Sequence, residues 1–415
     1  MKLLKKISLL LLATLLFYGC DKVTTERSYQ VRLPKFESMS ALRLRGDQMV
    51  VLPQPLESTG KIYVYGDYLF INEPMKGVHI YNNTDPKNPV AVTYLKVPGN
   101  VDMAINAGML YVDSYVDLLT FDLSDPAKPT LVNRNEDVFV SLYQRDYTNA
   151  SSDEMMVVSG YRDTLISSKD EDIYKPYIQK EYLVYDNANA GGNYGQGGSM
   201  ARFTLSKEHL YAVDHYKLHL FQVSDKRKPA YVKDIELGWG IETIFPYKDH
   251  LFIGSNTGMF IYDVTTPGEP ARVSHYQHMR ACDPVVVNDD YAFVTLRTGV
   301  ACGGAQNVLE VVDIKDLANP RLVKSYPMKN PHGLSLADDV LYLCEGAFGF
   351  KSFRVSDVHN VANNVLENLE NLVSTDVIVA PKSLIVIGEN GVSQYDYTDK
   401  AQLKLLSKIQ LAKSN

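Results

Sequence analysis

Residues 77–89 have the sequence GVHIYNNTDPKNP, a short apolar stretch followed by a turn rich in Asp and Pro. Pro presets φ and an Asp side chain can accept hydrogen bonds from nearby backbone N–H groups, so the stretch predicts a strand that ends in a tight turn. We interpret the turn Asp residues as structural rather than ligand-binding. Six further copies occur, at residues 118–129, 219–229, 259–270, 309–320, 351–360 and 392–402.

The copies are spaced at about forty residues, apart from one step of 100 residues between Asp125 and Asp225 and one of 50 between Thr266 and Asp316. Within a unit the sequence predicts four short strands; in the second unit they are residues 102–105, 109–112, 118–122 and 130–133. Four strands per unit, repeated seven times, predict an all-β fold, a β-propeller of seven four-stranded blades. A β-sandwich array or a solenoid is the structural alternative, and the long step leaves room for an eighth blade.

The N-terminus has the pattern of an export signal. Lys2, Lys5 and Lys6 precede an apolar run at residues 7–17, which is too short to cross a bilayer as a mature helix. The run ends at Gly19-Cys20, which resembles the lipobox of bacterial lipoproteins and implies lipidation of Cys20; an ordinary signal peptide is the alternative. We therefore expect a signal peptide at 1–19, a polar tether and lead-in at 20–50, and one propeller domain at 51–415, lipid-anchored in the outer membrane or envelope.

Composition narrows the function classes. The chain is 45% hydrophobic and 22% charged, as in a soluble globular protein, and its net charge is −7. No basic stripe is present, so a nucleic-acid partner is not expected. The glycine-rich run GGNYGQGGS at 191–199 lacks the Lys-Ser/Thr pair of a phosphate loop, which argues against nucleotide binding.

A family resemblance adds to this fold prediction. The strand–turn units, together with CDPVVVNDDYAFVTLRTG at 282–299, RLVKSYPMKNP at 321–331 and NPHGLSLADDVLYLCEG at 330–346, resemble the LVIVD-repeat lipoproteins of Bacteroidetes-type bacteria. The resemblance extends from about Lys61 to the C-terminus with one interruption. It implies a β-propeller and no established activity.

We call the strands of a blade A to D from the inside outward, and we call the face that carries the D-to-A and B-to-C loops the top. The long step holds an inserted loop at about 140–199, a D-to-A connection and hence on the top face. Eight of the 28 tyrosines lie in it. We predict a contact surface of these tyrosines and the single tryptophan, which is also in a D-to-A loop: Tyr143, Tyr147, Tyr161, Tyr174, Tyr177, Tyr182, Tyr185, Tyr194 and Trp239.

The cysteines that remain after Cys20 suggest one disulfide. Cys282 opens strand A of the fifth unit and Cys302 follows its strand B, so both are expected at the top of adjacent strands. A Cys282–Cys302 bond would contribute about 3 kcal/mol in the chain-entropy estimate. Cys344 ends an apolar run and is expected to be a buried thiol.

Polar residues recur where the A strands begin, and they would surround the upper mouth of the central channel. They are a candidate ligand or cation site, for Ca²⁺ or for a polyol that stacks on Trp239; alternatively, they hydrogen-bond the next blade. No HExxH or CxxC motif is present, and no resident metal or other cofactor is expected. The residues are Asp102, Arg202, Glu242, Asp283, His332 and Asp376, with Lys61 a weaker equivalent in the first unit.

The sequence therefore favours a lipid-anchored envelope propeller that acts as a binding or scaffold module through its insertion-bearing top face. Its partners would be the membrane, through Cys20, and a protein or glycan. The alternatives are a glycan hydrolase or lyase that uses carboxylates of the channel mouth, and a small-ligand or cation sensor at the same place. No residue is assigned a catalytic role.

Overall fold

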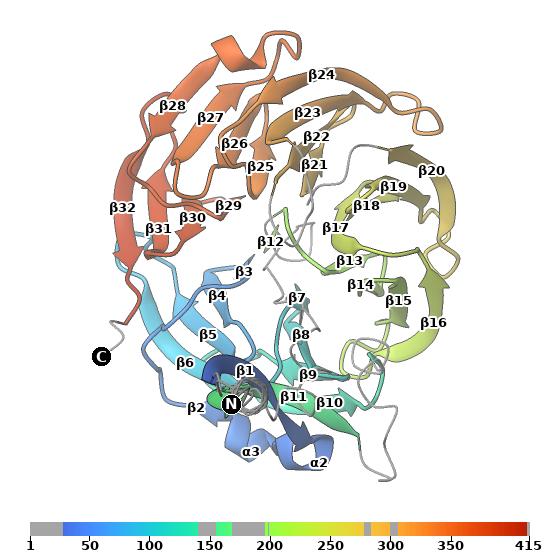
Figure 1. The fold of residues 1–415 in the computed structure, drawn as a ribbon, viewed down its shortest axis with the longest axis vertical. Helices are drawn as coiled ribbons and strands as arrows, with labels where there is room; N and C mark the ends of the chain where they lie inside the picture. Colours follow the sequence, from blue (N-terminus) through green and yellow to red (C-terminus); the bar gives the residue numbers. More distant parts are fainter. Residues whose placement is uncertain are drawn as a thin grey trace, which may run out of the picture. The chain divides into compact units, whose positions relative to one another are not determined.

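The structure is a computed structural model that describes residues 28–139, 155–167, 196–197, 199–277, 284–298 and 306–412. The chain divides into two compact units, residues 1–37 with 158–183, and residues 38–157 with 184–415. In the smaller unit, the described residues belong to a two-stranded sheet of β1 (Ser28–Ser38) and β11 (Met156–Ser167). The larger unit is a ring of seven sheets (Figure 1).

Each of the seven blades has four antiparallel strands in chain order, and the sheet of blade 1 is extended by β12 and β2 at its two edges, which confirms the prediction of a seven-bladed propeller. Blades 1 and 2 comprise β3 (Ile62–Tyr65), β4 (Tyr68–Glu73), β5 (Gly77–Asn82) and β6 (Val90–Lys96), then β7 (Met103–Asn106), β8 (Met109–Ser114), β9 (Asp117–Asp122) and β10 (Thr130–Asn135). Blades 3 and 4 comprise β13 (Phe203–Ser206), β14 (His209–Val213), β15 (Lys217–Gln222) and β16 (Ala230–Glu236), then β17 (Ile241–Tyr247), β18 (His250–Ser255), β19 (Gly258–Asp263) and β20 (Ala271–Gln277).

Blades 5 to 7 continue the series. They comprise β21 (Val285–Val287), β22 (Tyr291–Leu296), β23 (Val308–Asp313) and β24 (Arg321–Pro327); β25 (Leu334–Ala337), β26 (Val340–Cys344), β27 (Phe350–Arg354) and β28 (Val365–Leu369); and β29 (Asp376–Val379), β30 (Leu384–Gly388), β31 (Gly391–Asp396) and β32 (Lys404–Ile409). A short 3₁₀ helix, Val361–Asn363, precedes β28. Every D strand carries a β-bulge near its start, at the same place in all seven blades.

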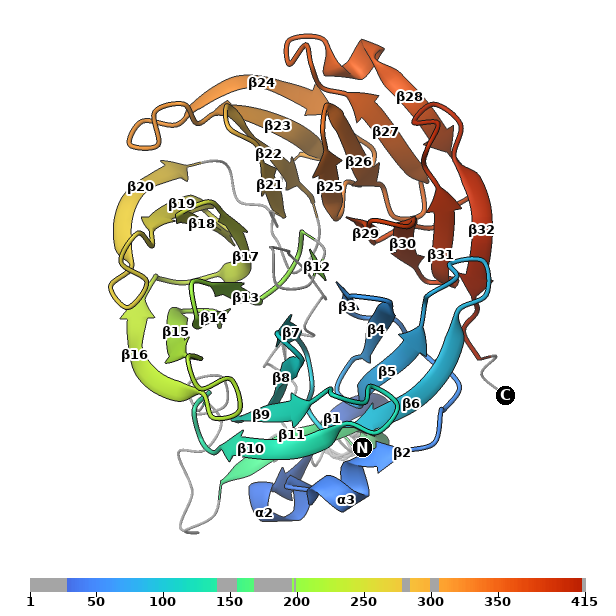
Figure 2. The same cartoon turned by 180° about the vertical axis from the view of Figure 1, so that it is seen from behind.

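The A strands are innermost and contact one another in sequence from β3 to β29 (Figures 1 and 2). The apolar core lies between neighbouring blades rather than within one, because each sheet has two apolar faces. For example, Leu251 of blade 4 packs against Leu220 of blade 3. Such a blade cannot bury its faces alone, which is why the repeats fold only as a ring.

The repeated turns cap themselves as the sequence predicts. Asp85 Oδ1 accepts the N–H of Lys87 at 3.0 Å, and the equivalent aspartates of five other blades do the same two residues ahead: Asp125, Asp225, Asp316, Asp357 and Asp399. These Asx turns reverse the direction of the chain between strands C and D.

The same turns also join the blades. The hydroxyl of Tyr111 in β8 donates to the carbonyl of Lys226 in the turn of blade 3, and Tyr211 in β14 donates to Pro267 in the turn of blade 4, both at 2.9 Å. Tyr326 of β24 donates to Val358 at 2.6 Å in the turn of blade 6. The C-to-D turns of blades 3, 4 and 6 therefore bind the blade before them, which the sequence alone did not indicate.

The ring closes between blades 7 and 1 by side chains, without exchange of a strand. Gln394 of β31 and Asn83 exchange two buried amide hydrogen bonds, of 3.0 and 2.7 Å. Ser407 of β32 donates to the carbonyl of Pro86 at 2.6 Å, and Ile62 packs against Ile385 in a shared apolar cluster. In both views β32 lies beside β6, so the first and last blades meet directly (Figures 1 and 2).

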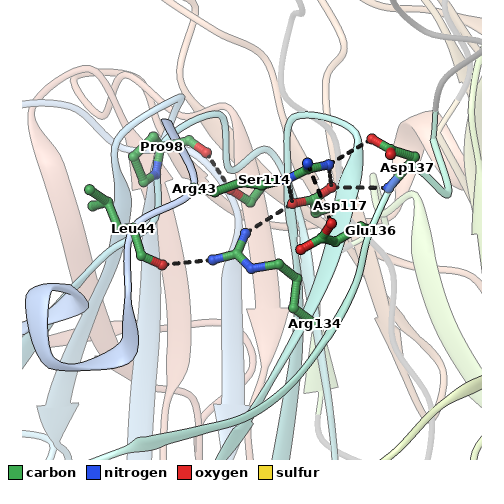
Figure 3. A network of polar contacts seen from close by, with 8 residues as sticks. All are labelled: Arg43, Leu44, Pro98, Ser114, Asp117, Arg134, Glu136 and Asp137. Atoms are coloured by element: carbon green, nitrogen blue, oxygen red, sulfur yellow. Dashed lines mark hydrogen bonds and ion pairs between the residues drawn. The ribbon is translucent and has the colours of Figure 1, made fainter. Parts of the chain in front are cut away.

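A lead-in segment covers the outer side of blades 1 and 2. It contains α2 (Met39–Leu42), α3 (Gly46–Met49) and β2 (Val50–Val51), which adds to the edge of β6. Its Arg43 makes a two-bond contact with the buried carboxylate of Asp117, 2.9 Å for each bond (Figure 3). Arg134 of β10 holds the same carboxylate and also donates to the carbonyl of Leu44. The lead-in is thus fixed to blade 2 by an Arg–Asp–Arg cluster.

Three strands lie in segments where the sequence indicated none. In the polar tether and lead-in predicted at 20–50, residues 28–38 form β1. In the inserted loop predicted at about 140–199, residues 156–167 form β11, and Gln196–Gly197 form β12, which pairs with β3 on the inner side of blade 1. Pairing with distant strands, rather than local pattern, determines these elements.

Candidate functional site

The polar residues predicted at the channel mouth do lie at or next to the starts of the inner strands. Asp102 precedes β7, Arg202 precedes β13, Glu242 is in β17, His332 precedes β25, and Asp376 opens β29. Asp283 lies outside the described residues. Their environments differ, since Asp102 and Asp376 are 2% and 4% exposed while the other three are half-buried.

Asp102 is engaged by backbone groups. Its Oδ1 accepts the N–H of Met103 at 2.7 Å, and its Oδ2 accepts those of Arg202 and Phe203, in the lead of the next blade, at 2.5 and 3.1 Å. These are the contacts expected if the polar residues hydrogen-bond the neighbouring blade. Asp113, at the end of β8, similarly accepts the N–H groups of Val101 and Asp102, and burial raises its pKa to about 6.

The chain itself crosses the channel. β12 pairs with β3 of blade 1, Ser199 Oγ accepts the N–H of Leu334 of blade 6 at 2.8 Å, and the carbonyl of Ala201 accepts the N–H of Ile244 of blade 4 at 2.7 Å. The carbonyl of Met200 accepts a 2.9 Å bond from Nζ of Lys61, which is 1% exposed. Residues 196–197 and 199–201 therefore contact blades 1, 6 and 4 on the inner side of the ring.

Lys61 is the charged residue of blade 1 that contacts this segment. Its Nζ is 3.9 Å from Oδ2 of Asp102. Burial lowers the pKa of Lys61 to about 8, against the opposing effect of the Asp102 charge. Lys61 is therefore buried between the carbonyl of Met200 and the carboxylate of Asp102, and we interpret its role as structural.

Acidic residues at the ends of the B strands are used in a second recurring contact. Glu73 Oε2 is 2.7 Å from Nε2 of His79, Asp214 Oδ2 is 3.0 Å from Nε2 of His219, and Glu345 pairs with Lys351. An acid followed five or six residues later by a basic side chain was a signal present in the sequence. It marks pairs that span the B-to-C loops of blades 1, 3 and 6.

His219 has carboxylates on both sides, since its Nδ1 is 2.8 Å from Oδ1 of Asp234. Burial disfavours the charged ring, but the hydrogen bonds to Asp214 and Asp234 outweigh it and raise the pKa of His219. The other oxygen of Asp214 accepts the N–H groups of Tyr216 and Lys217, both at 2.7 Å. This cluster therefore shapes the loop at 215–217.

That loop contacts an exposed aromatic side chain on the top face. Trp239, in the loop between β16 and β17, is 44% exposed, and its ring centroid is 4.8 Å from that of Tyr216 and 6.3 Å from that of His215. The N–H of Leu237 binds the carbonyl of Tyr216, and the N–H of Gly240 binds that of His215. We call Trp239, Tyr216 and His215 the aromatic platform.

The remaining predicted residues can be placed only in part. Tyr161 is in β11 of the smaller unit, 39% exposed, with the Arg32 guanidinium 5.3 Å from its ring centroid. Cys344 is fully buried in β26, as predicted, and burial raises the pKa of its thiol well above the usual value. Cys20, Cys282, Cys302 and the tyrosines Tyr143, Tyr147, Tyr174, Tyr177, Tyr182, Tyr185 and Tyr194 lie outside the described residues.

Two further findings concern the described part of the chain alone. It contains no group of three His, Cys, Asp or Glu side chains arranged to hold a metal ion. None of its helices is long and apolar enough to cross a bilayer.

Comparison with known proteins agrees with the fold. Residues 280–327 match the LVIVD repeat, and this segment spans the four strands of blade 5, so the predicted resemblance is confirmed there. No curated protein matches the chain in sequence.

Several solved structures share the architecture. A protein from Lactobacillus plantarum has a TM-score of 0.56 at 11% identity, covering 86% of this chain and 97% of that one. Saccharomyces cerevisiae Sqt1 gives 0.52 at 8% identity over 86% and 87%, and the computationally designed Ika8 protein gives 0.52 at 7% over 88% and 92%. Identities this low establish the fold alone. The chain is a seven-bladed β-propeller that carries an LVIVD repeat.

Proposed function

We propose that the protein is a lipid-anchored propeller of the cell envelope that binds a partner through its top face. The observation that carries this proposal is the pair of exposed aromatic side chains in the loops of the top face; the other exposed large apolar side chains of the blades, among them Val90, Tyr231 and Leu322, lie in D strands. Among the described loops that connect the blade strands, the large apolar side chains that are exposed are Trp239, at 44%, and Phe348, at 49%. Both are in top-face loops, a D-to-A loop and a B-to-C loop. Exposed aromatic groups of this kind are typical anchors of binding surfaces.

The bottom face supports the same view by what its turns do. Their aspartates cap their own backbone, and several of their carbonyls accept hydrogen bonds from the preceding blade. These groups maintain the ring. The chain also leaves blade 2 on the top face, because the N–H of Phe139 binds the carbonyl of Val116 in a B-to-C loop.

Binding is favoured over catalysis by the state of the carboxylates. A glycan hydrolase or lyase needs two accessible carboxyl groups across the mouth. Asp102 and Asp376 are almost fully buried, and both oxygens of Asp102 accept backbone hydrogen bonds.

A photo-cross-linking residue placed at single positions in the native envelope tests the choice of face. Positions 239 and 348 on the top face should give covalent adducts with a partner. Positions 128 and 226, exposed lysines of two bottom turns, are the matched controls and should give few adducts. Adducts that form mainly from the bottom positions would contradict the proposal.

The lipid anchor is tested separately. Cys20→Ser should abolish metabolic incorporation of a fatty acid and move the protein from the membrane to the soluble fraction. Incorporation that persists in the variant would contradict lipidation at Cys20.

A further inference from the structure

The loop that carries Trp239 is fixed by its backbone conformation and by hydrogen bonds to a neighbouring loop. Gly238 and Gly240 on either side of Trp239 have φ values of 109° and 82°, a region that favours glycine. The loop is fixed to its neighbour by the N–H groups of residues 237, 240 and 241, which bind the carbonyls of Tyr216 and His215. The backbone that carries the indole ring is thus held in place, which lowers the ordering entropy that a ligand must overcome.

The residues beside the Trp239 loop are polar. Asn256 donates its backbone N–H to the carbonyl of Gly240 at 2.8 Å, and its side chain packs so closely that a Cβ on Gly240 would lie 2.3 Å from Asn256 Cγ. Thr257 beside it is exposed, and Glu242 is half-buried. In the described loops of blades 3 and 4 on this face, Trp239 is the large apolar side chain that is exposed.

The single exposed ring favours one class of ligand over another. A hydrophobic peptide segment needs a groove with several apolar contacts along its length. Here the exposed apolar group is one aromatic ring, with the side chain of Asn256 packed against Gly240 next to it in the chain. A pyranose ring has the matching form, because its C–H face carries slight positive charge toward the negative π-face of the indole and its hydroxyl groups point outward.

We propose that the aromatic platform binds a neutral glycan, with one sugar ring stacked on Trp239. The proposal rests on the top-face binding function and names its ligand class. A neutral glycan is favoured over an acidic one, since the chain has a net charge of −7 and both Glu242 and Asp214 lie close to the platform in sequence. Tyr216 supports the indole through its 4.8 Å ring contact.

The chain has one tryptophan and 28 tyrosines, so fluorescence excited at wavelengths that tyrosine does not absorb reports the Trp239 ring alone. We would titrate the full mature chain with maltohexaose, cellohexaose, laminarihexaose, mannohexaose and chitohexaose, and with a proline-rich peptide as the competing class. At least one oligosaccharide should shift or quench the emission saturably, and calorimetry should give the same affinity.

Variants locate the site. W239A should weaken binding at least about tenfold, W239F should retain most of it, and K128A on the bottom face should leave it unchanged. A folding control is the circular dichroism spectrum of each variant. Binding that survives W239A in a folded protein would overturn the assignment of the site.

The outcomes also separate this inference from the proposed function. If no oligosaccharide binds, or if only the peptide does, the glycan inference fails, while protein adducts from position 239 in the envelope would keep the binding function. If position 239 forms no adduct and no ligand binds, both fail.

Discussion

Three tyrosines at the same place in strand B allow the inter-blade role of the turns to be measured. Tyr111 and Tyr211 each donate a 2.9 Å hydrogen bond to a turn carbonyl of the next blade. Tyr342 occupies the equivalent position in blade 6 and is fully buried, but its hydroxyl has no hydrogen-bond partner among the described residues. All three tyrosines are fully buried, and within the described part of the chain the hydroxyl hydrogen bond is present at two of the sites and missing at the third.

Replacing each tyrosine by phenylalanine removes the hydroxyl and keeps the ring. A buried hydrogen bond contributes about 1 kcal/mol net, so Tyr111→Phe and Tyr211→Phe should each lower the free energy of unfolding by about that amount. Tyr342→Phe should be neutral or stabilising, because it removes a buried polar atom that has no partner. Since Tyr111 and Tyr211 are in separate interfaces, the double variant should lose about the sum.

The assay is urea unfolding of the mature chain, followed by far-ultraviolet circular dichroism, with the midpoint compared at constant slope. Equal losses at all three positions would show that the ring environment, and not the bond to the turn, sets the effect. No loss at Tyr111 and Tyr211 would refute the inter-blade role of the turns.

Three further perturbations test other parts of the structure by the same unfolding assay. Gln394→Ala removes the buried amide pair with Asn83 that closes the ring and should cost about 1–3 kcal/mol, whereas Gln402→Ala at an exposed turn should cost almost nothing; equal effects would contradict closure through Gln394. Arg43→Ala should cost roughly 1.5–3 kcal/mol because it breaks charged hydrogen bonds to buried Asp117, while Arg45→Ala, which breaks a solvent-exposed pair with Asp47, should cost much less; the reverse order would refute the role of the Arg43 cluster. His219 has a raised pKa, so its contribution to stability should be fully present below pH of about 6.5 and be lost as the pH rises through that raised value; His219→Gln should flatten this part of the pH profile and exposed His359→Gln should not, and an unchanged profile in His219→Gln would contradict a charged His219.

The repeat allowed the ring to be predicted because it is a local signal. The strand in residues 77–82 and the capping by Asp85 need only neighbouring residues, and the seven units follow from recurrence. The spacing of Asp102 and Asp376 likewise placed them at the inner strands. Burial was not predictable, because the segment that covers the channel comes from the far end of the insertion.

The missed elements all depend on long-range pairing. β1 pairs with β11 more than a hundred residues away, and Arg43 meets Asp117 across 74 positions. Only part of the aromatic platform could be predicted, because the sequence placed Trp239 in a D-to-A loop. The partner ring of Tyr216 could be assigned only once blades 3 and 4 were placed side by side.

The central claim is that the top face binds and the bottom turns hold the ring together. Hydrogen–deuterium exchange of the chain with and without its partner, purified from the native envelope by position-239 adducts, tests it directly. The account predicts slowed exchange in peptides that cover 215–217 and 237–241, with no change at 84–89, 124–129 and 224–229. Slowed exchange confined to those three turns would contradict it.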